Sequence, residues 1–94
     1  MVIIEDSLKE IEEANEEIRK LLDLELPKNF RINWKGEYPK IEKKDFIGWD
    51  EIADIYRNDD IIEINFYCKE DFEELREYFE KSPTKFIIKF GDYY

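Results

Sequence analysis

The sequence contains no histidine, one cysteine and three widely separated glycines. Without histidine, nucleophilic catalysis lacks its usual general base and zinc lacks its usual nitrogen ligand. Three isolated glycines do not form a phosphate-binding loop. The single thiol of Cys68 cannot form a disulfide within the chain, which favours a reducing compartment. We therefore expect neither an enzyme nor a metal or cofactor site.

Long hydrophobic runs are also missing. No apolar stretch approaches the roughly 20 residues that a transmembrane helix requires, and the first residues do not have the pattern of a signal peptide. These features predict a cytoplasmic protein that does not enter the membrane.

Charge and aromatic residues are abundant in this chain of 94 residues, which has a formal net charge of −10 and contains two Trp, six Tyr and seven Phe. So many large rings are not typical of a disordered polyanion and indicate one compact domain spanning residues 1–94. The acidity disfavours direct binding to nucleic acid or anionic lipid and suits a basic protein partner. Acidity that serves solubility alone remains an alternative.

The N-terminal third predicts a short strand and a long helix. Met1–Ile4 is apolar and β-branched, which is typical of a strand. Ser7 and Glu10 form a capping box, and apolar residues then recur at helical spacing. Pro27 prevents continuation, so we expect the helix to end near Asp23.

The middle of the chain predicts a strand, an ambiguous segment and a short helix. Residues 30–35 alternate apolar and polar side chains, as in a half-buried strand. Because Pro39 is unsuited to a central strand, we expect an edge strand or an irregular loop through Ile47. Asp50 could cap a short helix carrying apolar residues 52–56, and residues 58–60 favour a turn.

The last third predicts a strand–helix–strand unit. Residues 61–68 alternate, with Cys68 on the inward face as an inert small hydrophobe. Asp71 opens a helix whose apolar stripe comprises Phe72, Leu75, Tyr78 and Phe79, and residues 85–90 form the last strand. The fold class is therefore α+β or α/β, with a mixed three- to five-stranded sheet, two long helices, one short helix and a C-terminal parallel βαβ unit.

Two short segments resemble the SUKH family of toxin-immunity proteins, over less than a third of the chain: residues 26–30, with the sequence Leu-Pro-Lys-Asn-Phe, and residues 49–53, with the sequence Trp-Asp-Glu-Ile-Ala. The acidic, helix-covered pattern is also similar to barstar-type inhibitors, although the Tyr-Gly-x-Asn motif of those inhibitors is absent. Both resemblances imply an acidic inhibitor of a protein partner, and no residue role is carried over from either.

These observations predict a small acidic inhibitor or immunity-type protein that mimics nucleic acid and occludes a basic protein, such as a nuclease or another nucleic-acid-binding enzyme. The alternative is an adaptor or assembly subunit with a permanent partner. Oligomeric state stays open. The partner-binding surface is predicted in the C-terminal half, and the Glu-rich face of the first helix is its rival. The predicted partner-binding residues are Asp59, Asp60, Glu63, Tyr67, Glu70, Glu73, Glu74, Glu77 and Tyr78.

Overall fold

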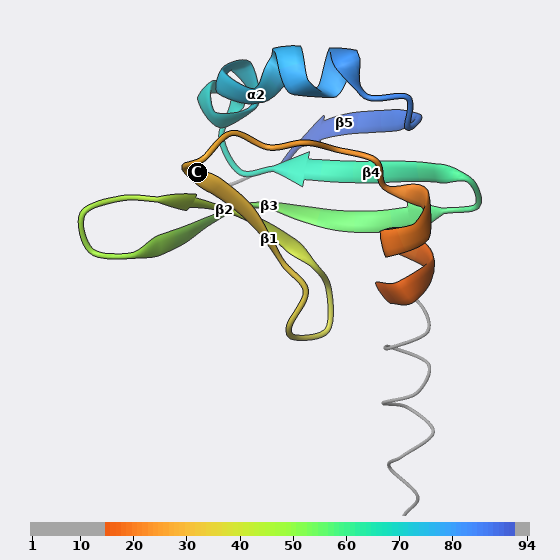
Figure 1. Ribbon diagram of the computed structural model, residues 1–94, viewed down its shortest axis with the longest axis horizontal. Helices are drawn as coiled ribbons and strands as arrows, with labels where there is room; N and C mark the ends of the chain where they lie inside the picture. The colour runs from red at the N-terminus through yellow and green to blue at the C-terminus, as the bar shows by residue number, and fades with distance from the viewer. Residues whose placement is uncertain (1–14, 92–94) are drawn as a thin grey trace, which may run out of the picture.

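Five strands form one mixed sheet in the order β1-β2-β3-β4-β5 in a computed structural model that describes residues 15–91 (Figure 1). The first four strands pair with one another in antiparallel fashion, and β5 is parallel to β4. A first helix is described over residues 15–21. The other elements are β1 (Phe30–Asn33), β2 (Lys40–Lys44), β3 (Trp49–Asn58), β4 (Ile61–Phe66), α2 (Lys69–Lys81) and β5 (Phe86–Phe90). The expected mixed sheet and C-terminal βαβ unit are confirmed, and the chain forms an α+β domain.

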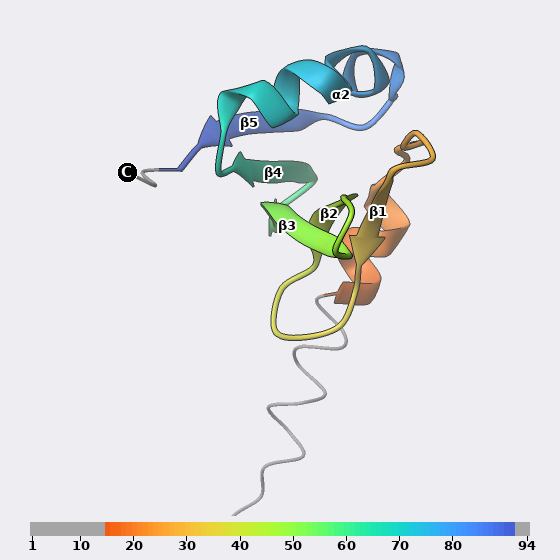
Figure 2. The ribbon, with the colours of Figure 1, turned by 90° about the vertical axis from the view of Figure 1, so that its left-hand side faces the viewer.

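Helix α2 joins the two parallel strands and lies over β4 and β5 (Figure 2). Leu75 and Phe79 are its buried residues, and Phe72 packs beside them. The backbone N–H of Ser82 donates to the Phe79 carbonyl at 3.2 Å, and Pro83 follows outside the helix. The predicted apolar stripe and the predicted end of this helix are therefore confirmed.

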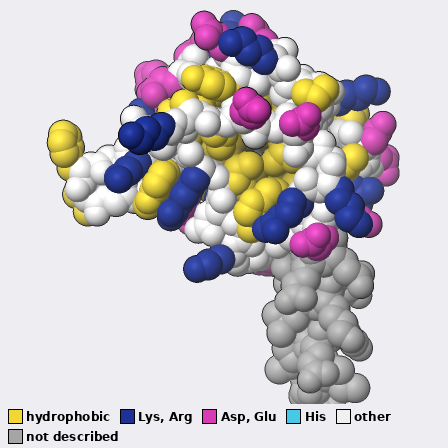
Figure 3. Space-filling model, in the orientation of Figure 1, with side chains coloured by type: hydrophobic (Ala, Val, Ile, Leu, Met, Phe, Trp, Pro, Cys, Tyr) yellow, Lys and Arg dark blue, Asp and Glu magenta, His cyan; other side chains and the backbone are white. Residues whose placement is uncertain are grey.

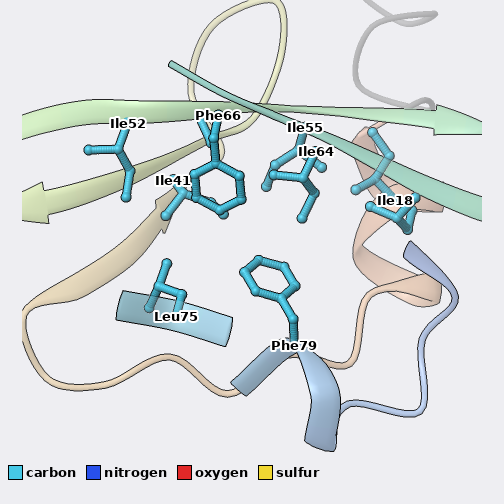
Figure 4. Packing of buried hydrophobic residues seen from close by; sticks show 10 residues of the cluster. Ile18, Ile41, Ile52, Ile55, Ile64, Phe66, Leu75 and Phe79 are labelled. Atoms are coloured by element: carbon cyan, nitrogen blue, oxygen red, sulfur yellow. The ribbon is translucent and has the colours of Figure 1, made fainter. Parts of the chain in front are cut away.

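Both described helices cover the same face of the sheet, which we call the covered face. In Figure 4, Leu75 and Phe79 point from α2 toward the strands, and Ile18 of the first helix lies beside Ile64. Aromatic rings meet edge to face at the centre, with 5.8 Å between the centroids of Phe66 and Phe79. The fully buried strand residues of this core are Ile41, Ala53, Ile55, Ile62, Ile64 and Phe66.

The expectation of a short helix over residues 50–56 is wrong, because this segment belongs to β3, the longest strand. Ala53 pairs with both Ile41 and Phe66, so the strand lies inside the sheet. The register of β2 and β3 shifts between Ile41 and Glu42. This bulge buries the adjacent residues Ile52 and Ala53 together, a pattern that imitates helical spacing.

The expectation of an edge strand or loop before Ile47 is also wrong, because β2 pairs with β1 on one side and β3 on the other. Pro39 is fully buried but directly precedes the first residue of β2. Its missing N–H therefore falls outside the ladder. Its carbonyl still accepts a hydrogen bond from the Ile55 N–H at 3.0 Å.

The junction between β4 and α2 differs from the expectation as well. Cys68 lies beyond the strand, is exposed and occupies the N-cap position of α2 with an extended backbone. Asp71 does not cap the helix but lies in its first turn, where carboxylates favour the positive end of the helix dipole. The predicted strand Met1–Ile4 and the capping box at Ser7 lie outside the described residues.

Candidate functional site

Neither of the described helices lies on the second face of the sheet, which we call the open face. Because side chains alternate along a strand, this face receives the polar residues that lie between those of the core. They come from all five strands: Arg31, Asn33, Lys40, Glu42, Asp54, Tyr56, Glu63, Asn65 and Lys89, with the apolar Ile87 among them. The open face is therefore rich in charge.

Asp54 is the centre of one polar cluster on the open face. The hydroxyl of Tyr67 donates to its Oδ1 at 2.7 Å, and the hydroxyl of Tyr56 donates to its Oδ2 at 3.3 Å. The ammonium of Lys40 lies 3.6 Å from the same carboxylate and 3.0 Å from Glu51. Burial and then the negative charge of Asp54 raise the pKa of Tyr56. Both carboxylate oxygens of Asp54 therefore already have partners within the protein.

Glu42 is the centre of a second polar cluster and the only buried carboxylate among the described residues. It accepts hydrogen bonds from Arg31 at 2.7 Å and from Asn33 at 3.1 Å, and the Arg31 guanidinium stacks 4.1 Å from the ring centroid of Trp49. Burial alone would raise the pKa of Glu42, but these hydrogen bonds and the charges of Arg31 and Lys40 together lower it. The carboxylate of this cluster, too, is paired with donors from the same protein.

A row of carboxylates on the outer face of α2 behaves differently. Its members follow each other at intervals of three, four and three residues, opposite the buried stripe, and all are exposed. None of the ion pairs found among the described residues involves Glu70, Glu77 or Glu80, whereas Glu73 is 2.6 Å from Arg76. Acidic side chains, with basic ones between them, gather over α2 along the upper edge of Figure 3. We call Glu70, Glu73, Glu77 and Glu80 the α2 stripe.

The structure distributes the nine predicted binding residues over separate surfaces. Glu70, Glu73 and Glu77 belong to the α2 stripe, and Glu74 on the same helix instead pairs with Lys43 of β2 at 2.6 Å. Tyr78 is half-buried beside a pocket that is also lined by Asp23 and Lys81.

The four remaining predicted residues lie away from α2. Glu63 lies on the open face, 3.5 Å from Lys89, and the hydroxyl of Tyr67 reaches Asp54 on that same face. Asp59 and Asp60 form the exposed turn between β3 and β4 and share a pocket with Glu17 of the first helix. The two acidic turn residues therefore add charge to the rival surface rather than to α2.

One exposed feature was missed in part by the sequence reasoning. Phe46 and Ile47 occupy the turn between β2 and β3 and are 109% and 98% exposed. The two Trp, six Tyr and seven Phe are more rings than the inner faces of the strands and helices need, so an outward position was plausible for Phe46, but Ile47 carries no such signal. Asp45 and Gly48, which flank the pair, are the turn-forming residues that could have identified this tip.

No group of three or more side chains that could hold a metal ion occurs among residues 15–91, and no helix in that range is long and apolar enough to cross a membrane. Comparisons with protein-family models, curated proteins and solved structures find no match to this chain. The resemblances to immunity proteins and inhibitors therefore gain no support from these comparisons.

Proposed function

We propose that this chain is a small acidic binding protein that occludes a basic surface on a protein partner. The α2 stripe is the observation that carries the proposal, because its carboxylates are exposed and three of them are without a cation in the described residues. A nuclease or another nucleic-acid-binding enzyme is the class of partner that fits. We propose no catalytic activity for the protein itself. The free thiol of Cys68 agrees with a cytoplasmic location.

The α2 stripe presents a row of like charges, as a nucleic acid strand does, although the interval between its charges is wider than that between phosphates. Successive carboxylates rise by about 4.5–6 Å along the helix axis, while each strand of a duplex carries one phosphate per ~3.4 Å of axis. A partner with Lys and Arg arranged along a phosphate backbone could therefore meet these carboxylates in a row. Their common sign would also accelerate encounter with such a partner.

The stripe is held in place by the core beneath it. Leu75 and Phe79 anchor the opposite side of α2 against the sheet, so the helix does not have to order itself on binding. Preorganisation of this kind reduces the entropic cost of association. The polar clusters of the open face offer less to a basic partner, because each of their central carboxylates already contacts a cation.

The test compares two variants with equal charge change. The joint substitution Glu70→Gln, Glu77→Gln and Glu80→Gln neutralises the stripe, and Glu25→Gln, Glu37→Gln and Glu51→Gln removes three exposed carboxylates outside α2 and the first helix. A protein captured from the source cell by the wild type is purified, and its association rate is measured at low and high salt. We expect the stripe variant to associate several-fold more slowly at low salt, with the difference shrinking as salt rises.

Two outcomes would contradict this proposal. If both variants lose the same amount of affinity, the overall charge matters and the stripe has no special role. If both bind like the wild type, the acidity serves solubility, and the alternative of an adaptor with an apolar, salt-insensitive interface gains support. The exposed Phe46 and Ile47 are the observation that favours that second candidate.

A further inference from the structure

The tip of the β2–β3 hairpin displays two apolar side chains to solvent. Phe46 and Ile47 are 109% and 98% exposed, far more than any other large hydrophobic residue in the described part of the chain. The hairpin extends away from the body of the protein (Figure 1), and yellow apolar side chains stand at the far left of Figure 3. Large apolar residues presented together in this way mark interaction sites.

The backbone of the tip is held by its own hydrogen bonds. The Oδ1 atom of Asp45 accepts from the Ile47 N–H at 2.8 Å and from the Gly48 N–H at 2.9 Å. The Asp45 N–H donates to the Gly48 carbonyl at 2.7 Å. The turn therefore presents both apolar side chains from an ordered backbone, which lowers the entropic cost of inserting them into a pocket.

A second copy of the chain and a membrane are poor occupants for this tip. Three pockets among the described residues are lined by charged side chains such as Asp23, Arg57 and Arg31, so none of the three is an apolar recess for a phenyl ring. Two copies with a net charge of −10 each also repel each other, and the same charge opposes approach to anionic lipid. Two apolar side chains alone are a weak membrane anchor under these conditions.

We propose that Phe46 and Ile47 form an anchor that inserts into an apolar pocket on the basic protein partner. The identity of that partner rests on the proposed function. The 2.6 Å ion pair between Lys43 and Glu74 places the hairpin arm beside α2, the helix that carries the α2 stripe. Buried aromatic anchors of this kind dominate the binding energy of many interfaces.

Carboxylates at the base of the tip indicate a basic rim around the pocket. Asp45 and Asp50 are both exposed and flank the tip, next to the single exposed cation of Lys44. A Lys or Arg on the partner would pair with these two carboxylates. The same partner would therefore combine an apolar pocket with a positively charged edge, which fits a basic protein.

The experiment places the photocrosslinking residue p-benzoyl-phenylalanine at position 46 and, as a control, at position 87 on the open face of β5. The full-length protein is irradiated in lysate of the source cell, and separately with vesicles of neutral and anionic lipid. We expect position 46 to crosslink to the same protein that the wild type captures, and position 87 not to. Crosslinks from position 46 to lipid, to a second copy of the chain or to no protein would overturn the inference.

Substitutions then separate the anchor from the stripe. We expect Phe46→Ser to weaken binding of the captured protein about tenfold or more at low and high salt alike, with Ile87→Ser as the matched control that binds normally. If Phe46→Ser binds normally while the stripe variant fails, the anchor is wrong and the proposed function stands. If Phe46→Ser fails and the stripe variant binds normally, the anchor stands and the electrostatic proposal is wrong.

Discussion

The two faces of the sheet are built from the same strands by different means. On the covered face, Ile62, Ile64 and Phe66 are completely buried under the helices. On the open face, Glu63 and Asn65 alternate with them and remain half-buried. Apolar burial is non-directional, whereas the polar clusters depend on particular donors and acceptors. The covered face therefore supplies most of the stability, and the open face adds specific pairs.

This contrast also bears on function. The carboxylates of the open face that contact cations are engaged within the protein, while Glu70, Glu77 and Glu80 on the outside of α2 have no such partner in the described residues. Carboxylates that are already paired within the protein contribute less binding free energy to a partner than carboxylates whose charge is uncompensated. The helix that closes the core is thus also the element we assign to binding.

The largest effect should follow truncation on the covered face. Replacing Ile64 by Ala removes a fully buried side chain from the centre of the core and should cost about 2–5 kcal/mol of unfolding free energy. Urea unfolding monitored by circular dichroism measures this loss. Ile87→Ala on the open face is the control and should cost well under ~1 kcal/mol. Equal costs would mean that the two faces do not differ as described.

A smaller effect is expected at the buried carboxylate of the open face. Glu42→Gln should cost about 1–3 kcal/mol at pH 7, because the charge-assisted hydrogen bonds from Arg31 and Asn33 are lost. The lowered pKa of Glu42 stabilises the fold above the ordinary carboxyl pKa, and this stabilisation is lost as pH falls through the folded-state pKa. The difference between variant and wild type should therefore shrink below about pH 4. A difference that is independent of pH would contradict the ionised pair.

The tyrosines around Asp54 should have smaller effects still. Tyr67→Phe removes the hydroxyl that donates to Asp54 at 2.7 Å and should cost about 0.5–1.5 kcal/mol. Tyr56→Phe removes a longer hydrogen bond of 3.3 Å and should cost less. Thermal and urea unfolding of the two variants provide the ranking. The reverse order would show that Tyr67 is not the stronger hydrogen-bond donor to Asp54.

The smallest effect should appear at the start of α2. Because Cys68 is exposed and makes no side-chain capping bond, Cys68→Ser should change stability by less than ~0.5 kcal/mol. The thiol of the folded wild type should react with a maleimide at a rate near that of the unfolded protein. Strong protection of the thiol would contradict the exposed position of Cys68 and favour the inward position that the alternation of residues 61–68 predicts.

The elements with an undisturbed pattern could be predicted from the sequence. Residues 61–66 and 86–90 alternate, and the apolar stripe of α2 recurs at helical spacing, so β4, β5 and α2 were expected and are confirmed. The bulge in β3 buries the adjacent residues Ile52 and Ala53. Two consecutive buried residues break the alternation typical of a strand, so the sequence pattern favoured a helix. A pairing shift depends on the neighbouring strand and has no signal within β3 itself.

The candidate site was harder to predict because sequence proximity does not determine which face a residue occupies. Alternation places Glu63 on the side of the sheet opposite α2, and the β3–β4 turn carries Asp59 and Asp60 to the first helix. The spacing of the α2 stripe was visible in the sequence. The ion pair that engages Glu74 was not, because Lys43 lies in a distant strand.

The central claim is that the outside of α2, and not the open face, contacts the partner. Backbone amide chemical shifts of the isotope-labelled protein, recorded while the captured partner is added, test this claim most directly. We expect chemical-shift changes or line broadening to concentrate in residues 70–80 and in the tip at residues 45–48. The amide signals of Glu63, Asn65 and Lys89 should stay unchanged. Changes concentrated on those open-face residues, with α2 unaffected, would contradict it.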